Sequence, residues 1–314
     1  MVKKFSVSLA FFVSVIFCSQ NLHAQGFNSI TTPDGVNVIA VGDAGLIYKS
    51  QNGGNTWASY TVPSVNFKSV TSFNNDVWIS GGNGKIYKTL KSNAPVNPIE
   101  LGITKSLNAI TFVSETSGFV CGDSGIILKT VNGGSNWTTS NSGIPANVDL
   151  TAVSFLDNSK GIVAGKGGKV YLTVNGGSSW TEEVTGTTRN IKDAKYFADG
   201  IVITGEYGTL FFKQGTSTWT QINTRVQTDV NAVSGSSISD VHLCGGGGFI
   251  RNNKNGNARF YNFEINPMMG NLVDIVYYNE NLGFAVSSLN NAIIRTTNGG
   301  TQWTLTAGAT VSYQ

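Results

Sequence analysis

The chain has 314 residues, of which 40% are apolar and 12% are charged, and its formal net charge is +3. This apolar content is sufficient for a packed core, so the composition excludes an intrinsically disordered protein. The small net charge provides no large basic field, which excludes an extended nucleic-acid surface. The 38 glycines, together with the few charged residues, favour an all-β protein with many turns.

Residues 1–24 have the layout of a secretory signal peptide that is removed by cleavage. Lys3 and Lys4 precede an apolar run over Phe5–Phe17, and a polar stretch follows. This run is shorter than the roughly 20 residues that span a bilayer, and no later apolar segment is long enough. We therefore expect residues 25–314 to be exported to the periplasm, the cell surface or the medium, without a transmembrane segment.

A unit of about 41 residues repeats seven times along the mature chain. Each unit has two short apolar strands that lead to a Gly-x-x-Gly turn, seen as VGDAG, SGGNG, CGDSG, AGKGG, TGEYG and CGGGG. A degenerate seventh copy, SSLNN, places Ser288 in the position of the first glycine. A third strand follows each turn, and a second glycine turn leads to a fourth strand.

Four short antiparallel strands per unit predict a seven-bladed β-propeller that forms one domain. Its first strand is expected at Phe27–Thr31 and its last at Trp303–Thr306, so that each terminal blade is complete from local sequence. The expected blades are approximately residues 26–60, 67–100, 107–140, 150–184, 191–222, 230–264 and 272–306.

The turn between the third and fourth strands carries the motif Asn-Gly-Gly-x-x-Trp in four of the units. Asn-Gly is a strong hairpin signal because both residues accept positive φ. A motif copied around a ring meets different surroundings in each blade, so we interpret it as a structural turn with an apolar anchor. The structural residues are Asn52, Trp57, Asn132, Trp137, Asn175, Trp180, Asn298 and Trp303, with Trp219 ending a shorter copy.

Two cysteines remain after cleavage, and an exported protein first suggests a disulfide between them. Cys121 and Cys244 occupy the same position in the third and sixth blades, which lie nearly opposite one another in a ring of seven. A disulfide needs Cα atoms within about 7 Å, so we predict two free, buried thiols. With His242 as the one histidine of the mature chain, no metal site is expected.

The Gly-x-x-Gly turns and the links between blades lie on one face of a propeller, and the Asn-Gly-Gly turns lie on the other. Propellers usually bind ligands on the first face, called the wide face here. Its residues vary between repeats, as a binding surface requires. The candidate binding residues are Asp43, Asn83, Asp123, Lys166, Arg189, Glu206, Tyr207, Arg225 and Asn290.

A sialidase-like hydrolase would need an arginine cluster, a tyrosine–glutamate pair and an acid. The chain has five arginines, and Arg295 occupies a strand position where other repeats carry lysine. The adjacent Glu206 and Tyr207 are better explained as variable turn residues. No nucleophile elbow, phosphate loop or metal cluster is apparent, so we expect no catalytic residue and no cofactor.

The Asn-Gly-Gly-x-x-Trp turns resemble the Asp box (BNR repeat) of sialidases and related propellers, with asparagine in place of aspartate. The repeated GDxG…KTxNGGxxW units resemble the photosystem II stability and assembly factor family over residues 26–306. This resemblance implies a seven-bladed propeller outside the cytoplasm that assists assembly without catalysis and binds protein through arginines of one face. Arg189 and Arg225 are the arginines that this sequence offers there.

Three functions follow from these patterns. The leading one is an exported propeller that binds a protein partner and helps to assemble or scaffold a complex of the cell envelope or a membrane. The second is a glycan-binding propeller or glycoside hydrolase, which requires two carboxylates at hydrolase spacing beside aromatic surfaces. The third is a purely structural module, which predicts a wide face without a pocket.

Overall fold

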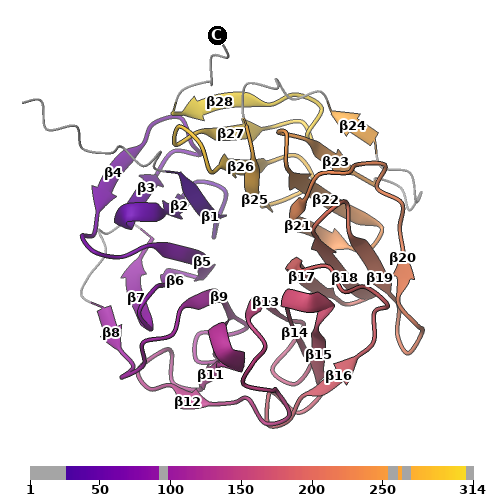
Figure 1. The fold of residues 1–314 in the computed structure, drawn as a ribbon. Helices are drawn as coiled ribbons and strands as arrows, with labels where there is room; N and C mark the ends of the chain where they lie inside the picture. The colour runs from indigo at the N-terminus through magenta and orange to yellow at the C-terminus, as the bar shows by residue number, and fades with distance from the viewer. Residues whose placement is uncertain (1–25, 92–97, 254–260, 264–269, 309–314) are drawn as a thin grey trace, which may run out of the picture.

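The computed structural model describes residues 26–91, 98–253, 261–263 and 270–308. Their strands form seven sheets of four antiparallel strands, arranged around a central axis (Figure 1). This arrangement confirms the seven-bladed β-propeller expected from the repeats. Every sheet is made of four consecutive strands, including the first sheet (β1–β4) and the last (β25–β28). The proposed signal peptide and the residues after 308 lie outside the described residues.

The strands of each blade follow one another from the axis to the rim (Figure 1). The innermost strands are β1 (Phe27–Thr31), β5 (Phe67–Phe73), β9 (Leu107–Phe112), β13 (Leu150–Phe155), β17 (Ile191–Phe197), β21 (Val230–Ser237) and β25 (Leu272–Tyr277). The second strands are β2 (Val38–Gly42), β6 (Asp76–Gly81), β10 (Gly118–Gly122), β14 (Gly161–Gly165), β18 (Gly200–Gly205), β22 (Asp240–Gly245) and β26 (Gly283–Ser287).

The Asn-Gly-Gly turns join the outer two strands of the first, third, fourth and seventh blades. The third strands are β3 (Leu46–Ser50), β7 (Lys85–Leu90), β11 (Ile127–Thr130), β15 (Val170–Thr173), β19 (Leu210–Lys213), β23 (Ile250–Asn252) and β27 (Ile293–Thr296). The outermost strands are β4 (Ala58–Thr61), β8 (Pro98–Glu100), β12 (Thr138–Thr139), β16 (Thr181–Glu183), β20 (Thr220–Gln221), β24 (Tyr261–Phe263) and β28 (Thr304–Ala307). The last strand therefore begins one residue after Trp303, where it was expected to begin.

Three short 3₁₀ turns, η1 (Asp43–Gly45), η2 (Asp123–Gly125) and η3 (Lys166–Gly168), connect second to third strands. The seventh blade corrects one detail of the repeat alignment. Ser287 pairs with Leu272, as Gly42 pairs with Phe27, so Ser287 occupies the first-glycine position that was assigned to Ser288. The degenerate turn shifted that alignment by one residue because its sequence contains no glycine.

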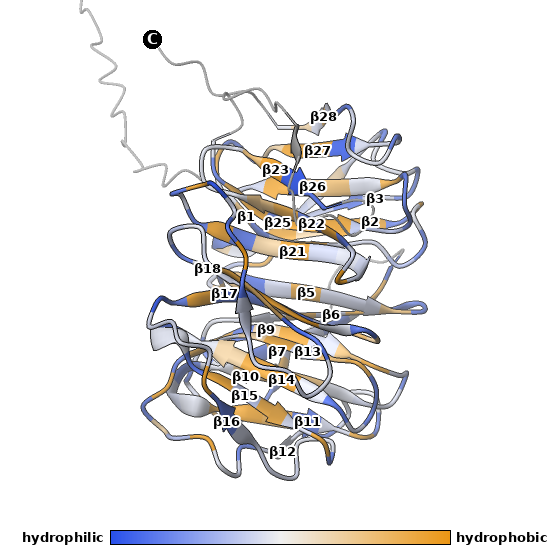
Figure 2. Ribbon diagram, turned by 90° about the vertical axis from the view of Figure 1, so that its right-hand side faces the viewer, coloured by the Kyte–Doolittle hydropathy of each residue, from blue (hydrophilic) through white to orange (hydrophobic). Residues whose placement is uncertain are grey.

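Apolar residues run along the strands, and polar residues lie mainly at the turns on both faces (Figure 2). Aromatic rings pack between neighbouring blades at three interfaces. Trp78 stacks on Phe112 with ring centroids 3.6 Å apart, and Phe119 stacks on Phe155 at 3.7 Å. His242 stacks on Tyr277 at 3.7 Å in the same way. The core therefore consists of layers between blades, with His242 serving as an aromatic ring.

The Asn-Gly-Gly turns share one hydrogen-bond pattern, illustrated by the third blade. The Thr130 hydroxyl donates to Asn132 Oδ1 (3.0 Å) and accepts from the Gly134 N–H (2.9 Å). Asn132 Oδ1 also accepts from the Asn136 N–H at 2.9 Å. The same three bonds recur around Asn52, Asn175 and Asn298. The motif therefore closes its own turn, as the sequence interpretation requires.

Replacing Asn132 with alanine is expected to destabilise the protein by about 1–2 kcal/mol, because the Asn136 N–H and the Thr130 hydroxyl lose their acceptor. Asn132→Asp keeps an oxygen at the Oδ1 position as the acceptor of both bonds and is expected to change stability by less than about 0.5 kcal/mol. Urea unfolding of the two variants checks the difference. Equal losses in both would show that the amide contributes in another way.

Long cations of the third strands connect the second, third and seventh blades to the turn of the next one. Lys88 Nζ donates to the Gly133 carbonyl (3.3 Å), and Lys129 Nζ donates to the Gly176 carbonyl (2.8 Å). Arg295 donates to Asn55 Oδ1 at 2.8 Å and joins the last blade to the first. The sequence interpretation treated these residues as ordinary strand residues, because a bond to the next repeat is not visible within one repeat.

Cys121 and Cys244 are both buried and free, which confirms the absence of a disulfide between them. Burial raises the pKa of both thiols. These cysteines therefore pack as small apolar residues.

Candidate functional site

The wide face is built on a hydrogen bond that recurs in all seven blades. In each blade, the N–H after the second strand donates to the carbonyl of the residue before the innermost strand. The bonds are Asp43 to Gly26, Gly82 to Asn66, Asp123 to Ser106, Lys166 to Asp149, Glu206 to Asn190, Gly246 to Asp229 and Ser288 to Asn271. This bond fixes the base of each turn, so the turn presents its next residue to solvent.

The presented residue adopts the left-handed backbone region. It is Ala44, Asn83, Ser124, Gly167, Tyr207 and Gly247 in the first six blades, with φ between 52° and 77°. Glycine and asparagine tolerate this region, other residues are disfavoured there by their Cβ atom, and a bulky aromatic residue is an outlier. Tyr207, with φ at 52° and 64% of its surface exposed, is therefore the exception among these six turn residues.

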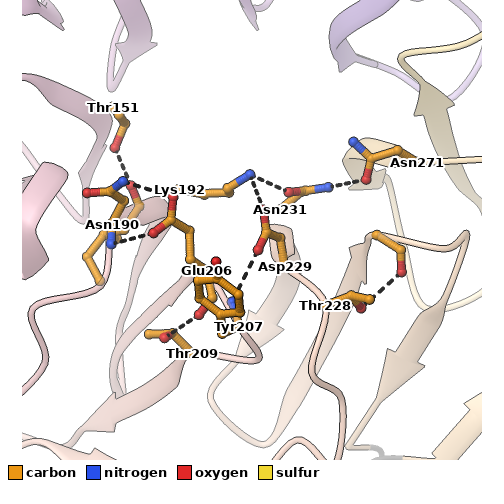
Figure 3. A network of polar contacts seen from close by, with 12 residues as sticks. Thr151, Asn190, Lys192, Glu206, Tyr207, Thr209, Thr228, Asp229, Asn231 and Asn271 are labelled. Atoms are coloured by element: carbon orange, nitrogen blue, oxygen red, sulfur yellow. Dashed lines mark hydrogen bonds and ion pairs between the residues drawn. The ribbon is translucent and has the colours of Figure 1, made fainter.

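Neighbouring segments hold Tyr207 in this conformation (Figure 3). Its N–H donates to Asp229 Oδ1 at 3.1 Å, and its carbonyl accepts from Arg189 Nη1 at 2.8 Å. The Arg189 guanidinium also lies 5.5 Å from the centre of the Tyr207 ring, within cation–π range. The Tyr207 ring thus lies against the Arg189 guanidinium and is open to solvent.

A charged network supports this arrangement from the innermost strands (Figure 3). Lys192 of β17 lies 2.8 Å from Asp229 Oδ2 and donates to Asn231 Oδ1 at 3.1 Å. Burial acts to raise the pKa of Asp229, but the hydrogen bonds from Lys192 and the Tyr207 N–H outweigh it and lower that pKa. Asp229 therefore remains ionised and keeps its hold on the turn.

Glu206 precedes Tyr207 and is also occupied in the fold. Its two carboxylate oxygens accept the Asn190 side-chain N–H (2.8 Å) and the Asn190 backbone N–H (3.2 Å). Asn190 Oδ1 in turn accepts the Gly167 N–H of the preceding blade. Glu206 thus fixes the Asn190 side chain that bonds to the preceding blade.

A groove of about 340 Å³ lies beside Tyr207. It is lined by Tyr207, Gly208, Gln221, Ile222, Asn223, Thr224 and Val226. The exposed Arg225 lies in the same link, where its N–H is held by Asn223 Oδ1 at 2.9 Å. Burial lowers the pKa of Arg251, and the positive charge of Arg225 lowers it further. The Arg251 guanidinium donates a hydrogen bond to the Thr224 carbonyl. The wide face at the fifth and sixth blades therefore combines an aromatic ring, several cations and a groove.

The structure brings Arg189, Glu206 and Tyr207 together, and Arg225 belongs to the link whose residues Asn223, Thr224 and Val226 line the adjacent groove. The other candidates are distributed around the ring. Asp43 accepts a hydrogen bond from the Asn28 side chain, and Asp123 accepts one from the Asn108 side chain, both at 2.9 Å. Lys166 pairs with Asp149 at 2.9 Å, and Asn83 and Asn290 are exposed left-handed residues.

Sequence reasoning missed the supporting residues Asn190, Lys192 and Asp229. A signal was present, because the position before the innermost strand is asparagine or aspartate in five of seven blades: Asn66, Asp149, Asn190, Asp229 and Asn271. At four of these positions a side-chain oxygen accepts the N–H of a left-handed turn residue in the preceding blade: Asn66, Asp149, Asn190 and Asp229. The hydrogen-bond partner lies about 22 residues earlier, outside the turn motif itself.

A glycoside hydrolase would need a general acid with a raised pKa. Lysine contacts lower the pKa of two wide-face carboxyls, whereas the pKa values of Asp193 and Asp274 on the innermost strands are raised. The hydrogen bond from Lys166 lowers the pKa of Asp149, and the one from Lys192 helps to lower that of Asp229. Among the described residues, no group of three or more histidine, cysteine, aspartate or glutamate side chains is placed to hold a metal ion. No helix in the described ranges is long and apolar enough to cross a membrane.

Residues 88–185 match the family model of "Photosynthesis system II assembly factor YCF48". This match confirms the expected resemblance. The matched segment runs from the third strand of the second blade to the end of the fourth blade, so Arg189 and Tyr207 lie beyond it. No curated protein matches the chain.

Solved structures give the same result for the fold. A YCF48 bound to D1 peptide has a TM-score of 0.74 at 16% identity, covering 88% of this chain and 94% of its own. YCF48 from Cyanidioschyzon merolae has a TM-score of 0.67 at 18% identity, covering 87% and 96%. An inactive virginiamycin B lyase from Staphylococcus aureus with quinupristin reaches 0.74 at 12% identity, covering 88% and 96%. At these identities the likeness to YCF48 and to the lyase is one of fold.

Proposed function

We propose that the protein is an exported, non-catalytic propeller that binds a protein partner through the wide face around Tyr207 and Arg189. In this role it helps to assemble or scaffold a complex of the cell envelope or a membrane. The match of residues 88–185 to an assembly-factor family supports this role. So does the structure of a YCF48 with a bound D1 peptide, because it is a similar propeller with a protein ligand.

The observation that carries the proposal is the strained, exposed Tyr207. A left-handed tyrosine costs about 1–2 kcal/mol of conformational energy, a cost that Gly167 and Gly247 avoid in the fourth and sixth blades. Strain of this kind is typically found at binding and catalytic sites. Exposed tyrosine and arginine side chains are also the residues that dominate protein interfaces. A partner that covers the ring and the adjacent groove would use both.

Co-purification from the native envelope tests the proposal. The tagged full chain is expected to retain a partner in a fixed ratio, and Arg189→Ala/Arg225→Ala is expected to lose it. Lys160→Ala is the control, because it removes a positive charge from an exposed turn between the first and second strands, on the opposite face. The mass of the recovered protein shows whether residues 1–24 are removed. Retention of the partner by the arginine variant would contradict the proposed site, and absence of any partner would contradict the function.

A further inference from the structure

The innermost strands line a central channel of about 220 Å³ whose wall is mostly polar. The third residue of each innermost strand follows a shift in the strand register, as between Phe27 and Ser29. A side-chain oxygen at this position can accept a hydrogen bond from the backbone N–H of the fourth residue of the next blade's innermost strand. Ser29 accepts the Val70 N–H (3.2 Å), and Ser69 accepts the Ile110 N–H (3.4 Å). These bonds connect one blade to the next at the channel wall.

Two aspartates take this position in the fifth and seventh blades, and each accepts two backbone N–H groups. Asp193 Oδ2 accepts the Val233 N–H of the next blade (2.9 Å), and Oδ1 accepts the Ala194 N–H of its own blade (2.8 Å). The preceding blade carries Ala152 at the same position, which has no side-chain acceptor. Asp193 therefore replaces the missing acceptor as well as serving the following blade.

Asp274 plays the same role where the ring closes. Its Oδ2 accepts the Ile30 N–H (2.9 Å) and the Ser29 hydroxyl (2.8 Å) of the first blade. Its Oδ1 accepts the Ile275 N–H of its own blade (2.8 Å). The preceding blade carries Ala232 at the equivalent position, which has no side-chain acceptor. Because each blade is built from consecutive strands, no shared strand joins the last blade to the first. The contacts of Asp274 therefore help to join the last blade to the first through side chains.

The charges that face these two carboxyl groups are few. Lys195 of β17 lines the channel and favours the ionised form of both aspartates. Two other lysines of the channel wall have partners away from it, since Lys68 lies 3.9 Å from Asp43 and Lys192 lies 2.8 Å from Asp229. The channel-lining residues of β1, β9, β13 and β21 have no titratable side chain. On β22, the buried Cys244 thiol lies within the electrostatic influence of both aspartates.

Burial and the negative charge of Asp193 raise the pKa of Asp274 to about 6. Burial also raises the pKa of Asp193. A carboxyl group with a raised folded-state pKa stabilises the fold fully below its unfolded pKa of about 4, and this contribution is lost as the pH rises through the folded value. The channel therefore disfavours having both aspartates ionised, with a single ammonium group, Lys195, facing the two of them.

We propose that Asp193, Asp274 and Lys195 form a pH-sensitive charge triad that closes the propeller ring most tightly at mildly acidic pH. Proton loss from Asp274 leaves two carboxylates for one lysine, which weakens the link between the last and first blades. Lys195 is the one lysine of the triad, because it lines the same channel and favours the ionised form of both aspartates.

Urea unfolding of the full chain at pH 5.0 and 7.5 tests the triad. From a shift of the pKa to about 6, the folding equilibrium constant of the wild type is expected to fall about tenfold more than that of Asp274→Asn over this range. Titration of all other groups is common to both proteins and cancels in the difference. Equal pH dependence in the two proteins would overturn the proposal.

Lys195→Met provides a second test that does not depend on the folding of the aspartate variant. Its folding equilibrium constant is expected to fall below the wild-type value several-fold more at pH 7.5 than at pH 5.0, and addition of Asp193→Asn is expected to restore it. Lys192→Met, from the same strand, is the matched control. Its partner Asp229 has a lowered pKa, so its effect should be the same at both pH values. A loss in Lys195→Met that does not change with pH would contradict the triad.

Discussion

Replacing Tyr207 with glycine is expected to weaken partner binding by at least about 30-fold, the effect of losing an interface hot spot of about 2 kcal/mol. Glycine occupies the same turn position in the fourth and sixth blades, as Gly167 and Gly247. The backbone bonds to Asp229 and Arg189 use main-chain atoms of residue 207, so they remain in the variant. The substitution therefore removes the ring while the turn is retained.

The stability of Tyr207→Gly separates binding from folding. Relief of the left-handed strain favours the variant by about 1–2 kcal/mol. The flexibility of glycine in the unfolded chain opposes it by about 0.5–1 kcal/mol. Loss of the contact with Arg189 opposes it by a further 0.5–1 kcal/mol or so. We expect stability within about 1 kcal/mol of the wild type, measured by urea unfolding beside the binding assay. Destabilisation of several kcal/mol would mean that Tyr207 serves the fold instead.

Replacing Trp78 with alanine is expected to destabilise the protein by about 3–5 kcal/mol. Trp78 has no exposed surface and stacks on Phe112 of the next blade, with ring planes 14° apart. Its removal leaves a cavity between two blades and ends the contact of Lys88 with the indole ring, 5.1 Å away. Thermal and urea unfolding measure the loss.

Trp78→Phe is the matched control, because Phe119 fills the equivalent position in the next blade and stacks in the same way. It is expected to cost less than about 1.5 kcal/mol, since the stack on Phe112 is retained. The buried indole N–H of Trp78 has no hydrogen-bond partner, so its removal carries no further penalty. Equal losses for alanine and phenylalanine would contradict the role given to the stack.

The architecture could be predicted from the sequence because its determinants are local. The glycines of the Gly-x-x-Gly turns and the asparagines such as Asn132 form turns whose hydrogen bonds close within a few residues. Copies of such turns at a regular spacing are enough to fix strand number, strand order and blade number. The alignment failed by one residue at Ser287, where the turn has lost its glycines.

The candidate site could be predicted only in part, because its supporting contacts cross between blades. Tyr207 and Arg189 were visible as residues that vary between the repeats. Their arrangement depends on Asp229 and Lys192, which come from different segments and meet only where the fifth and sixth blades pack together. The same holds for the channel, where Asp274 meets Ser29 across 245 positions of the chain. No pattern within one repeat indicates such a contact.

The most direct test of the proposed function is photo-crosslinking from position 207 in cells. A photoreactive residue replaces Tyr207 in the full chain, and a second protein carries it at Val174, which is 75% exposed on an Asn-Gly-Gly turn of the opposite face. We expect one discrete crosslinked partner from position 207 and none from position 174. A crosslink of the same partner from both positions, or from 174 alone, would contradict a binding site on the wide face.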